Sequence, residues 1–190
     1  NKNYNLIDET NDMILNSCDY GVPQIRKRVF LIGLRKDINY NVEDIYKNII
    51  KTHYQPCSDI EKRKGKEKYM TVMDAIGDLH PLKPGEGQEK SSYKLSFWND
   101  YLNIIRCKYD KFIFNHVVRT HNDMDRQRFK EMSRNRWTFQ ELLEKRPDLK
   151  HEKRRVFNNS YVVQFWDQPA RTIIAHLYKD GNQFIHPDYK

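Results

Sequence analysis

Apolar and polar positions follow strand-like patterns near both ends of the chain and a helical period in its middle. Apolar runs typical of strands lie at residues 12–17 and 28–34, and a Gly-Val-Pro turn at residues 21–23 separates them. Three more strand-like runs occupy residues 161–166, 171–178 and 182–186. The last two runs flank Lys-Asp-Gly-Asn at residues 179–182, which is a strong hairpin signal.

The middle of the chain predicts helices and loops. Helices are expected at residues 43–50, 71–79, 122–132 and 138–146. Two of them open with the spacing of a capping box, Thr71 with Asp74 and Thr138 with Glu141. Loops are expected at residues 58–70 and 84–100. This order of elements predicts an α+β fold, with a β-hairpin in residues 1–45 and a mixed lobe in residues 46–190.

Charge and cysteine content narrow the class of protein. The 190 residues hold 34 Lys plus Arg against 26 Asp plus Glu, a net charge of +8, which favours an acidic partner such as nucleic acid. Many unrelated soluble proteins are equally basic. Cys18, Cys57 and Cys107 lie far apart without a CxxC pair, which argues against a disulfide framework and a zinc site and suits a reducing compartment. No apolar run approaches the roughly 20 residues of a membrane span.

Gln24, Arg26 and Arg28 occupy alternate positions where the second strand is expected to begin. In one continuous strand they would share a face, with Ile25, Lys27 and Val29 on the other. The planar donor fork of arginine suits phosphate oxygens or a base carbonyl. The alternative is an edge strand whose charges prevent aggregation. The spacing by itself leaves both interpretations open.

Four segments resemble the C5-cytosine DNA methyltransferase family in the family's own order. The run LNSCDYGVPQIRKRVFLIGLRKD at 15–37 is similar to the Q-x-R-x-R region, and TVMDAIGDLHPL at 71–82 to a segment downstream of it. HVVRTHNDMDRQRF at 116–129 resembles the target-recognition region, and WDQPARTIIAHLYKDGNQFIHPD at 166–188 the ninth conserved motif. The resemblance implies a target-recognition lobe preceded by a β-hairpin that belongs to a Rossmann-like α/β methyltransferase domain.

The resemblance also implies roles for the strand. Arg28 would reach the flipped cytosine near its O2, Arg26 would hold the DNA backbone or the catalytic pocket, and Gln24 would position the strand. The family's S-adenosylmethionine-binding Phe-x-Gly-x-Gly, its Pro-Cys nucleophile and its Glu-Asn-Val motif have no match, and Cys57 after Pro56 lies on the wrong side of the family order. With Asn1 in place of an initiating Met, we therefore expect an internal fragment, inactive alone and without bound S-adenosylmethionine.

Double-stranded DNA is the partner that the resemblance implies, in the cytoplasm of a bacterium with a restriction-modification system. Candidate DNA contacts, for base reading or phosphate binding, are Arg134, Asn135, Arg136, Trp137, Arg119, Lys62, Arg63, Lys64, Arg154 and Arg155. The alternative for residues 134–137 is a solvated loop with Trp137 in the core. The spacing of His116 and His121 does not favour zinc, and packing across strands is expected for His176 and His186.

Two other functions remain open from the sequence: a stand-alone DNA-binding module without catalysis, and a relative directed to RNA. The arginine pair favours the enzyme, since a binding module has no need of an active-site motif. Separated from a larger sheet, residues 1–40 are expected to expose Val29, Phe30, Leu31 and Ile32, and to form a dimer or add a strand through this edge.

Overall fold

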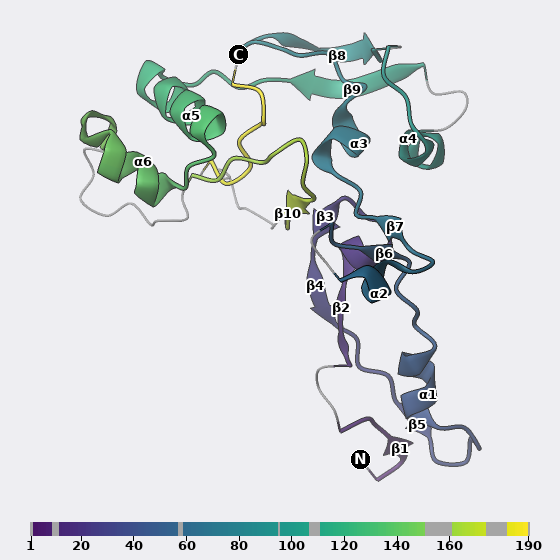
Figure 1. Cartoon of the computed structure of the whole chain (residues 1–190). Helices are drawn as coiled ribbons and strands as arrows, with labels where there is room; N and C mark the ends of the chain where they lie inside the picture. Colours follow the sequence, from purple (N-terminus) through teal and green to yellow (C-terminus); the bar gives the residue numbers. More distant parts are fainter. Residues whose placement is uncertain are drawn as a thin grey trace. The chain divides into compact units, whose positions relative to one another are not determined.

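The computed structural model of the chain describes residues 2–8, 12–56, 59–94, 96–106, 111–150, 161–173 and 182–189. The chain divides into two compact units, Asn1–Met70 and Thr71–Lys190. Both units combine short helices with small two-stranded sheets, which agrees with the predicted α+β class. Figure 1 shows the elements of each unit in chain order.

The first unit is built from short paired strands. Strands β1 and β5 pair antiparallel, as do β2 and β4, whereas β6 and β7 pair in parallel. Its core cluster comprises the buried Ile7, Met13, Val42 and Tyr46. In chain order its elements are β1 (Tyr4–Asn5), β2 (Ile14–Asn16), the 3-10 turn η1 (Ser17–Tyr20), β3 (Gln24–Ile25), β4 (Lys27–Val29), β5 (Leu34–Arg35), α1 (Val42–Lys47), β6 (His53–Tyr54), α2 (Ile60–Arg63) and β7 (Glu67–Lys68).

The hairpin predicted at residues 12–17 and 28–34 is present as β2 and β4, but its second strand is shorter than predicted. Strand β4 ends at Val29, and the Tyr46 hydroxyl then bridges the chain: it donates to the Phe30 carbonyl at 2.7 Å and accepts the Ile32 N–H at 2.8 Å. A side chain here replaces the strand partner that β4 would need in order to continue. Helix α1 confirms the helix predicted at residues 43–50.

The apolar edge of this hairpin is exposed as expected at three of its four positions. Val29, Phe30 and Leu31 are 67%, 50% and 65% exposed. The fourth prediction was wrong, because Ile32 is half-buried and packs against the cluster around Tyr46. The loop predicted at residues 58–70 was also wrong in part, since α2 and β7 lie within it.

The second unit places helices beside a long β-ribbon. Its main core cluster joins Phe129 and Met132 of α5, Phe139 and Leu142 of α6, and four residues of other segments, Leu149, Tyr161, Val163 and Ile185. In chain order its elements are α3 (Val72–Ile76), β8 (Gly87–Ser92), α4 (Asp100–Ile105), β9 (Phe112–Val117), α5 (Asp123–Asn135), α6 (Phe139–Lys145), the 3-10 turn η2 (Pro147–Leu149) and β10 (Ala170–Arg171).

The predicted helices of this unit are confirmed as α3, α5 and α6. Both capping boxes form: the Thr71 side chain accepts from the Asp74 N–H, and the Thr138 side chain accepts from the Glu141 N–H. The predicted loop at residues 84–100 was wrong, because six of its residues form β8, a strand that pairs antiparallel with β9. Strand β8 has no apolar alternation, so it depends on backbone pairing that its own sequence does not signal.

The C-terminal strands are only partly described. Val163 and Ile185 form an isolated parallel bridge in place of the regular strands predicted at residues 161–166 and 182–186. The predicted hairpin around residues 179–182 and most of the run 171–178 lie outside the described residues, as does His176. Within the described ranges, no helix is long and apolar enough to cross a membrane.

Candidate nucleic-acid interface

The segment that carries Gln24, Arg26 and Arg28 is held by hydrogen bonds from the preceding turn. The Ser17 hydroxyl donates to the Gln24 carbonyl at 2.5 Å, and the Arg26 N–H donates to the Asn16 Oδ1 at 3.0 Å. The Asn16 side chain thus takes a backbone donor that a continuous ladder would use. The segment is therefore two short strands, β3 and β4, with Arg26 between them, and the single strand predicted from the alternation was wrong.

The three side chains of this segment remain accessible. Gln24 is half-buried, whereas Arg26 and Arg28 are exposed. The Arg28 Nη1 donates to the carbonyl of its neighbour Lys27 at 2.7 Å. This bond satisfies one of the five donors of the guanidinium and leaves most of the fork directed at solvent. Hydrogen bonds thus fix the backbone of this segment, while the side chains of Arg26 and Arg28 remain exposed.

A buried carboxylate fixes the turn that precedes this segment. Asp19 is 6% exposed, accepts a hydrogen bond from the Tyr69 hydroxyl and pairs with Lys51 at 2.8 Å. The hydrogen bond to Asp19 raises the pKa of the Lys51 ammonium, so Lys51 stays charged at neutral pH. Gly21 follows with φ of +85°, and a Cβ there would come within 2.8 Å of the His53 ring. Glycine is therefore strongly favoured at this position.

Cys18 lies in the same turn. Its side chain is wholly buried, and burial raises the pKa of the thiol. A thiol that stays protonated and enclosed has neither the charge nor the access that nucleophilic attack requires. Cys57 and Cys107 lie outside the described residues.

In the second unit, the predicted base readers at residues 134–137 lie where α5 ends and the chain turns into α6, with Arg134 and Asn135 in the last turn of α5; we call this region the α5–α6 turn. Arg136 has a left-handed φ of +55° and binds Asp167 through two hydrogen bonds of 2.9 and 3.2 Å. The hydrogen bond from Arg136 lowers the pKa of Asp167. The Arg136 guanidinium also lies over the Phe165 ring, 4.3 Å from its centroid. Both partners of this ion pair are exposed, so it contributes little stability, at most about 1 kcal/mol.

The other members of this turn also contact the protein. The Arg134 Nε donates to the Tyr189 hydroxyl at 2.7 Å, and the Asn135 Nδ2 donates to the Glu131 carbonyl at 2.9 Å. Trp137 is half-buried and packs against the main core cluster. This agrees with the alternative interpretation of the sequence, which placed Trp137 in the core. Arg134, Asn135 and Arg136 are exposed. The turn thus presents three polar side chains on a rigid support.

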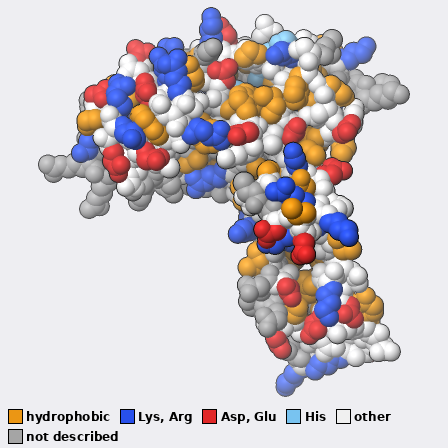
Figure 2. Space-filling view, in the orientation of Figure 1, with side chains coloured by type: hydrophobic (Ala, Val, Ile, Leu, Met, Phe, Trp, Pro, Cys, Tyr) orange, Lys and Arg blue, Asp and Glu red, His pale blue; other side chains and the backbone are white. Residues whose placement is uncertain are grey.

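The remaining residues predicted to contact DNA do not form one group in the sequence, and they are divided between the two units. In the first unit, Lys62, Arg63 and Lys64 are exposed at α2, where Lys62 pairs with Asp59 at 3.3 Å and Arg63 donates to the Pro56 carbonyl at 3.0 Å. In the second unit, Arg119 is exposed at the rim of a pocket. Arg154 and Arg155 lie outside the described residues. Figure 2 shows basic and acidic side chains interspersed over α5 and α6, so the face in view carries no single-sign patch there.

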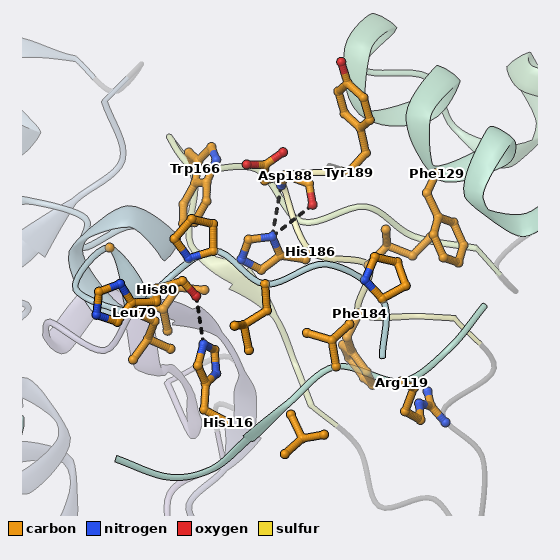
Figure 3. A pocket seen from close by; sticks show the side chains of 18 of the residues that line it. Leu79, His80, His116, Arg119, Phe129, Trp166, Phe184, His186, Asp188 and Tyr189 are labelled. Atoms are coloured by element: carbon orange, nitrogen blue, oxygen red, sulfur yellow. Dashed lines mark hydrogen bonds between the residues drawn. The ribbon is translucent and has the colours of Figure 1, made fainter. Parts of the chain in front are cut away.

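A pocket of about 650 Å³ in the second unit was not predicted from the sequence. Its walls come from α3, the end of β9, α5 and the C-terminal segment, and Figure 3 shows His80, His116 and His186 around it. The His116 Nε2 hydrogen-bonds the His80 carbonyl at 2.9 Å, and the His186 Nδ1 lies 3.1 Å from the Asp188 N–H. The described residues contain no group of three or more side chains able to hold a metal ion. Most of the residues that line the pocket are apolar, among them Met73, Ile76, Phe97 and Phe184.

A family model described as C-5 cytosine-specific DNA methylase matches residues 9–178, so the chain belongs to this family. Type II methyltransferase M.DdeI from Desulfomicrobium norvegicum is 31% identical over 181 residues, which cover 93% of this chain and 40% of that protein. M.Bpa9945I from Bacillus paralicheniformis is 28% identical over 190 residues, covering 95% and 39%. M.BspRI from Lysinibacillus sphaericus is 46% identical over 72 residues, covering 38% and 14%. The chain thus spans about two fifths of the first two relatives, and no solved structure matches it.

Proposed function

We propose that this chain supplies target recognition and target-cytosine positioning in a DNA (cytosine-5-)-methyltransferase of a bacterial restriction-modification system. The observation that carries the proposal is the Gln24–Arg28 segment, whose backbone is pinned by Asn16 and Ser17 while both arginine heads stay exposed. Residues 1–45 then complete the Rossmann-like catalytic domain, and residues 46–190 form the target recognition domain. The catalytic cysteine comes from a part of the enzyme outside these residues.

The reaction needs the cytosine outside the helix, because C5 is hidden inside the base stack. A cysteine thiolate attacks C6, which makes C5 nucleophilic toward a methyl donor. In this scheme the Arg28 guanidinium donates to the cytosine O2 and stabilises the negative charge that develops on the ring. Arg26 holds the DNA backbone or the pocket wall, and Gln24 positions the segment. All three residues act through binding and orientation.

S-adenosylmethionine supplies the methyl group in this proposal, but the described residues do not fit it. A nucleotide-type cofactor is commonly held by a glycine-rich loop at a helix N-terminus. The closest match here, Gly85 and Gly87, leads into a strand and is explained by packing: a Cβ on Gly87 would lie 2.3 Å from the His116 carbonyl oxygen. We therefore place no cofactor contact in this chain.

The exposed apolar edge at Val29, Phe30 and Leu31 fits the same proposal. An uncovered strand edge of this kind pairs readily with another chain segment. In the whole enzyme we propose that the catalytic sheet covers it. In the isolated chain we propose that a second copy does so, as a dimer or through an added strand.

Substitutions at the α5–α6 turn test sequence reading. Replacing Arg134, Asn135 or Arg136 by Ala in the enzyme that contains this chain is expected to change its base preference, because each bidentate base contact discriminates by about 1–3 kcal/mol. Replacing Lys62, Arg63 or Lys64 by Ala is expected to weaken binding to all sequences and to reduce the salt slope by about 1 per phosphate contact. Competition binding across a library of duplexes, at several salt concentrations, measures both effects.

Asp167→Ala is the matched control, because it releases Arg136 from its internal partner without removing the guanidinium. If Arg136 reads a base, R136A changes the preference and D167A preserves it. Equal changes in both variants would instead assign Arg136 to bracing the turn. A reversed pattern, with uniform weakening at residues 134–136 and altered preference at residues 62–64, would contradict the assignment.

Transfer of a labelled methyl group tests the activity itself. The purified enzyme, labelled S-adenosylmethionine and matched DNA and RNA substrates are combined, and the label is expected at C5 of cytosine in DNA. Label in RNA alone would support the RNA-directed alternative. Sequence-specific DNA binding without any transfer would support the stand-alone binding module.

A further inference from the structure

The ribbon formed by β8 and β9 has one buried and one exposed face. Strands β8 and β9 lie side by side and antiparallel (Figure 1), and Lys90 pairs with Phe114, Ser91 with Ile113 and Ser92 with Phe112. Ile113 is 7% exposed, whereas its neighbours Phe112 and Phe114 are 46% and 64% exposed. Because side chains alternate along a strand, Lys90, Ser92, Phe112 and Phe114 share the exposed face. We call these four residues the outer face of the ribbon.

A cation lies in the middle of this outer face. The Lys90 Nζ is 4.1 Å from the centre of the Phe112 ring and 5.9 Å from that of the Phe114 ring. Among the described residues, Lys90 forms no ion pair, and the outer face itself carries no carboxylate. The two rings hold the lysine stem in place, which leaves a pre-positioned positive charge between two exposed aromatic surfaces.

We propose that the outer face is a second docking surface for duplex DNA, in addition to the α5–α6 turn. The inference rests on the proposed function and extends it to a surface that the sequence did not indicate. A two-stranded ribbon has the dimensions to enter the major groove. The Lys90 ammonium binds a backbone phosphate. Phe112 and Phe114 pack against apolar groups of the groove, either sugars or thymine methyl groups.

The chemistry of the outer face favours DNA over a protein partner. Covering it with an apolar protein surface would bury the Lys90 ammonium without an acceptor, which carries a large desolvation cost. A phosphate meets the charge and leaves both rings in contact with apolar atoms. Four residues are also a small area compared with the roughly 800 Å² that each partner contributes to a stable protein interface.

Binding measurements on the full enzyme test this inference. Lys90→Ala is expected to raise the Kd for target duplex roughly threefold to tenfold and to lower the salt slope by about 1. Phe112→Ser with Phe114→Ser is expected to raise the Kd about tenfold with an unchanged slope, because the lost contact is apolar. Lys36→Ala, an exposed lysine of the first unit, and Ile104→Ser, an 81% exposed apolar residue of α4, are the matched controls and are expected to leave both quantities unchanged.

Circular dichroism melts establish that each variant is folded, and Phe114→Ser alone replaces the double variant if the latter does not fold. Unchanged Kd and salt slope in both ribbon variants, with a parent enzyme that binds DNA, would overturn the inference and leave the proposed function intact. A parent enzyme that binds no DNA would instead overturn the proposed function. A change in sedimentation without a change in DNA binding would overturn the inference in favour of self-association.

Discussion

Replacing Arg28 by Ala in the enzyme that contains this chain is expected to reduce methyl transfer about 100-fold to 1,000-fold, the usual loss when one preorganised charge-stabilising donor is removed. The Kd for DNA is expected to change only a few-fold. The difference arises because many phosphate contacts share the binding energy, whereas the charge on the flipped cytosine develops at one place. Single-turnover transfer of a labelled methyl group under saturating DNA measures the chemical step directly.

Lys27→Ala is the matched control for this prediction. Lys27 is adjacent, basic and exposed, and its backbone carbonyl, which accepts the Arg28 hydrogen bond, survives the substitution. We expect its methyl transfer to match that of the parent enzyme within a few-fold. Full single-turnover activity in Arg28→Ala, or equal losses in both variants, would remove Arg28 from the active site.

Replacing Arg128 by Met is expected to lower the free energy of unfolding of the second unit by about 3–5 kcal/mol, the range for breaking a buried ion pair from one side. Arg128 is 4% exposed, pairs with Asp125 at 2.7 Å and donates from its Nε to the Leu149 carbonyl at 2.8 Å. Its loss removes a partner from the half-buried Asp125 carboxylate and from the carbonyl of the buried Leu149. All three tryptophans, Trp98, Trp137 and Trp166, lie in this unit, so denaturation followed by tryptophan fluorescence reports on it selectively.

Arg126→Met controls for the loss of charge on the same helix. Arg126 is exposed and has a longer pair with Asp123, at 3.5 Å, so its removal is expected to cost less than about 1 kcal/mol. Equal stabilities of the Arg126 and Arg128 variants would show that the buried network contributes nothing specific.

At acid pH, the difference in free energy of unfolding between the Arg128→Met variant and the parent is expected to become smaller. Burial by itself would raise the pKa of Asp125, but hydrogen bonds from Tyr161 and Arg128 outweigh it and the pKa is lowered. A lowered native pKa stabilises the fold above the unfolded value of about 3.9, and that contribution is lost as the pH falls through the native pKa. The variant lacks part of this contribution, so the difference seen at pH 7 should shrink below about pH 4.

Local signals in the sequence predicted helices α1, α3, α5 and α6, but missed the short helices α2 and α4. The capping boxes at Thr71 and Thr138 each involve residues three positions apart, so the chain carries the whole signal within one turn. Strand β8 could not be predicted in this way. Its residues Gly-Gln-Glu-Lys-Ser-Ser have no apolar alternation, and its structure depends on pairing with β9, some 25 residues later along the chain.

The candidate site shows the same division between local and distant determinants. The order of Gln24, Arg26 and Arg28 is visible in the sequence, because the motif is contiguous. The break in the strand at Arg26 could not be predicted from the motif, because it depends on the side chain of Asn16, ten residues earlier. Likewise, the contact of Arg136 with Asp167 spans 31 positions, and the exposed pair Phe112 and Phe114 becomes a surface only once β8 is in place.

Base-resolution mapping of 5-methylcytosine in DNA from cells that express the full-length gene tests the central claim most directly. We predict 5-methylcytosine at one defined sequence context throughout the DNA, and its absence from cells that express the Arg28→Ala enzyme at the same level. DNA without 5-methylcytosine in cells that produce the folded parent enzyme would contradict the account.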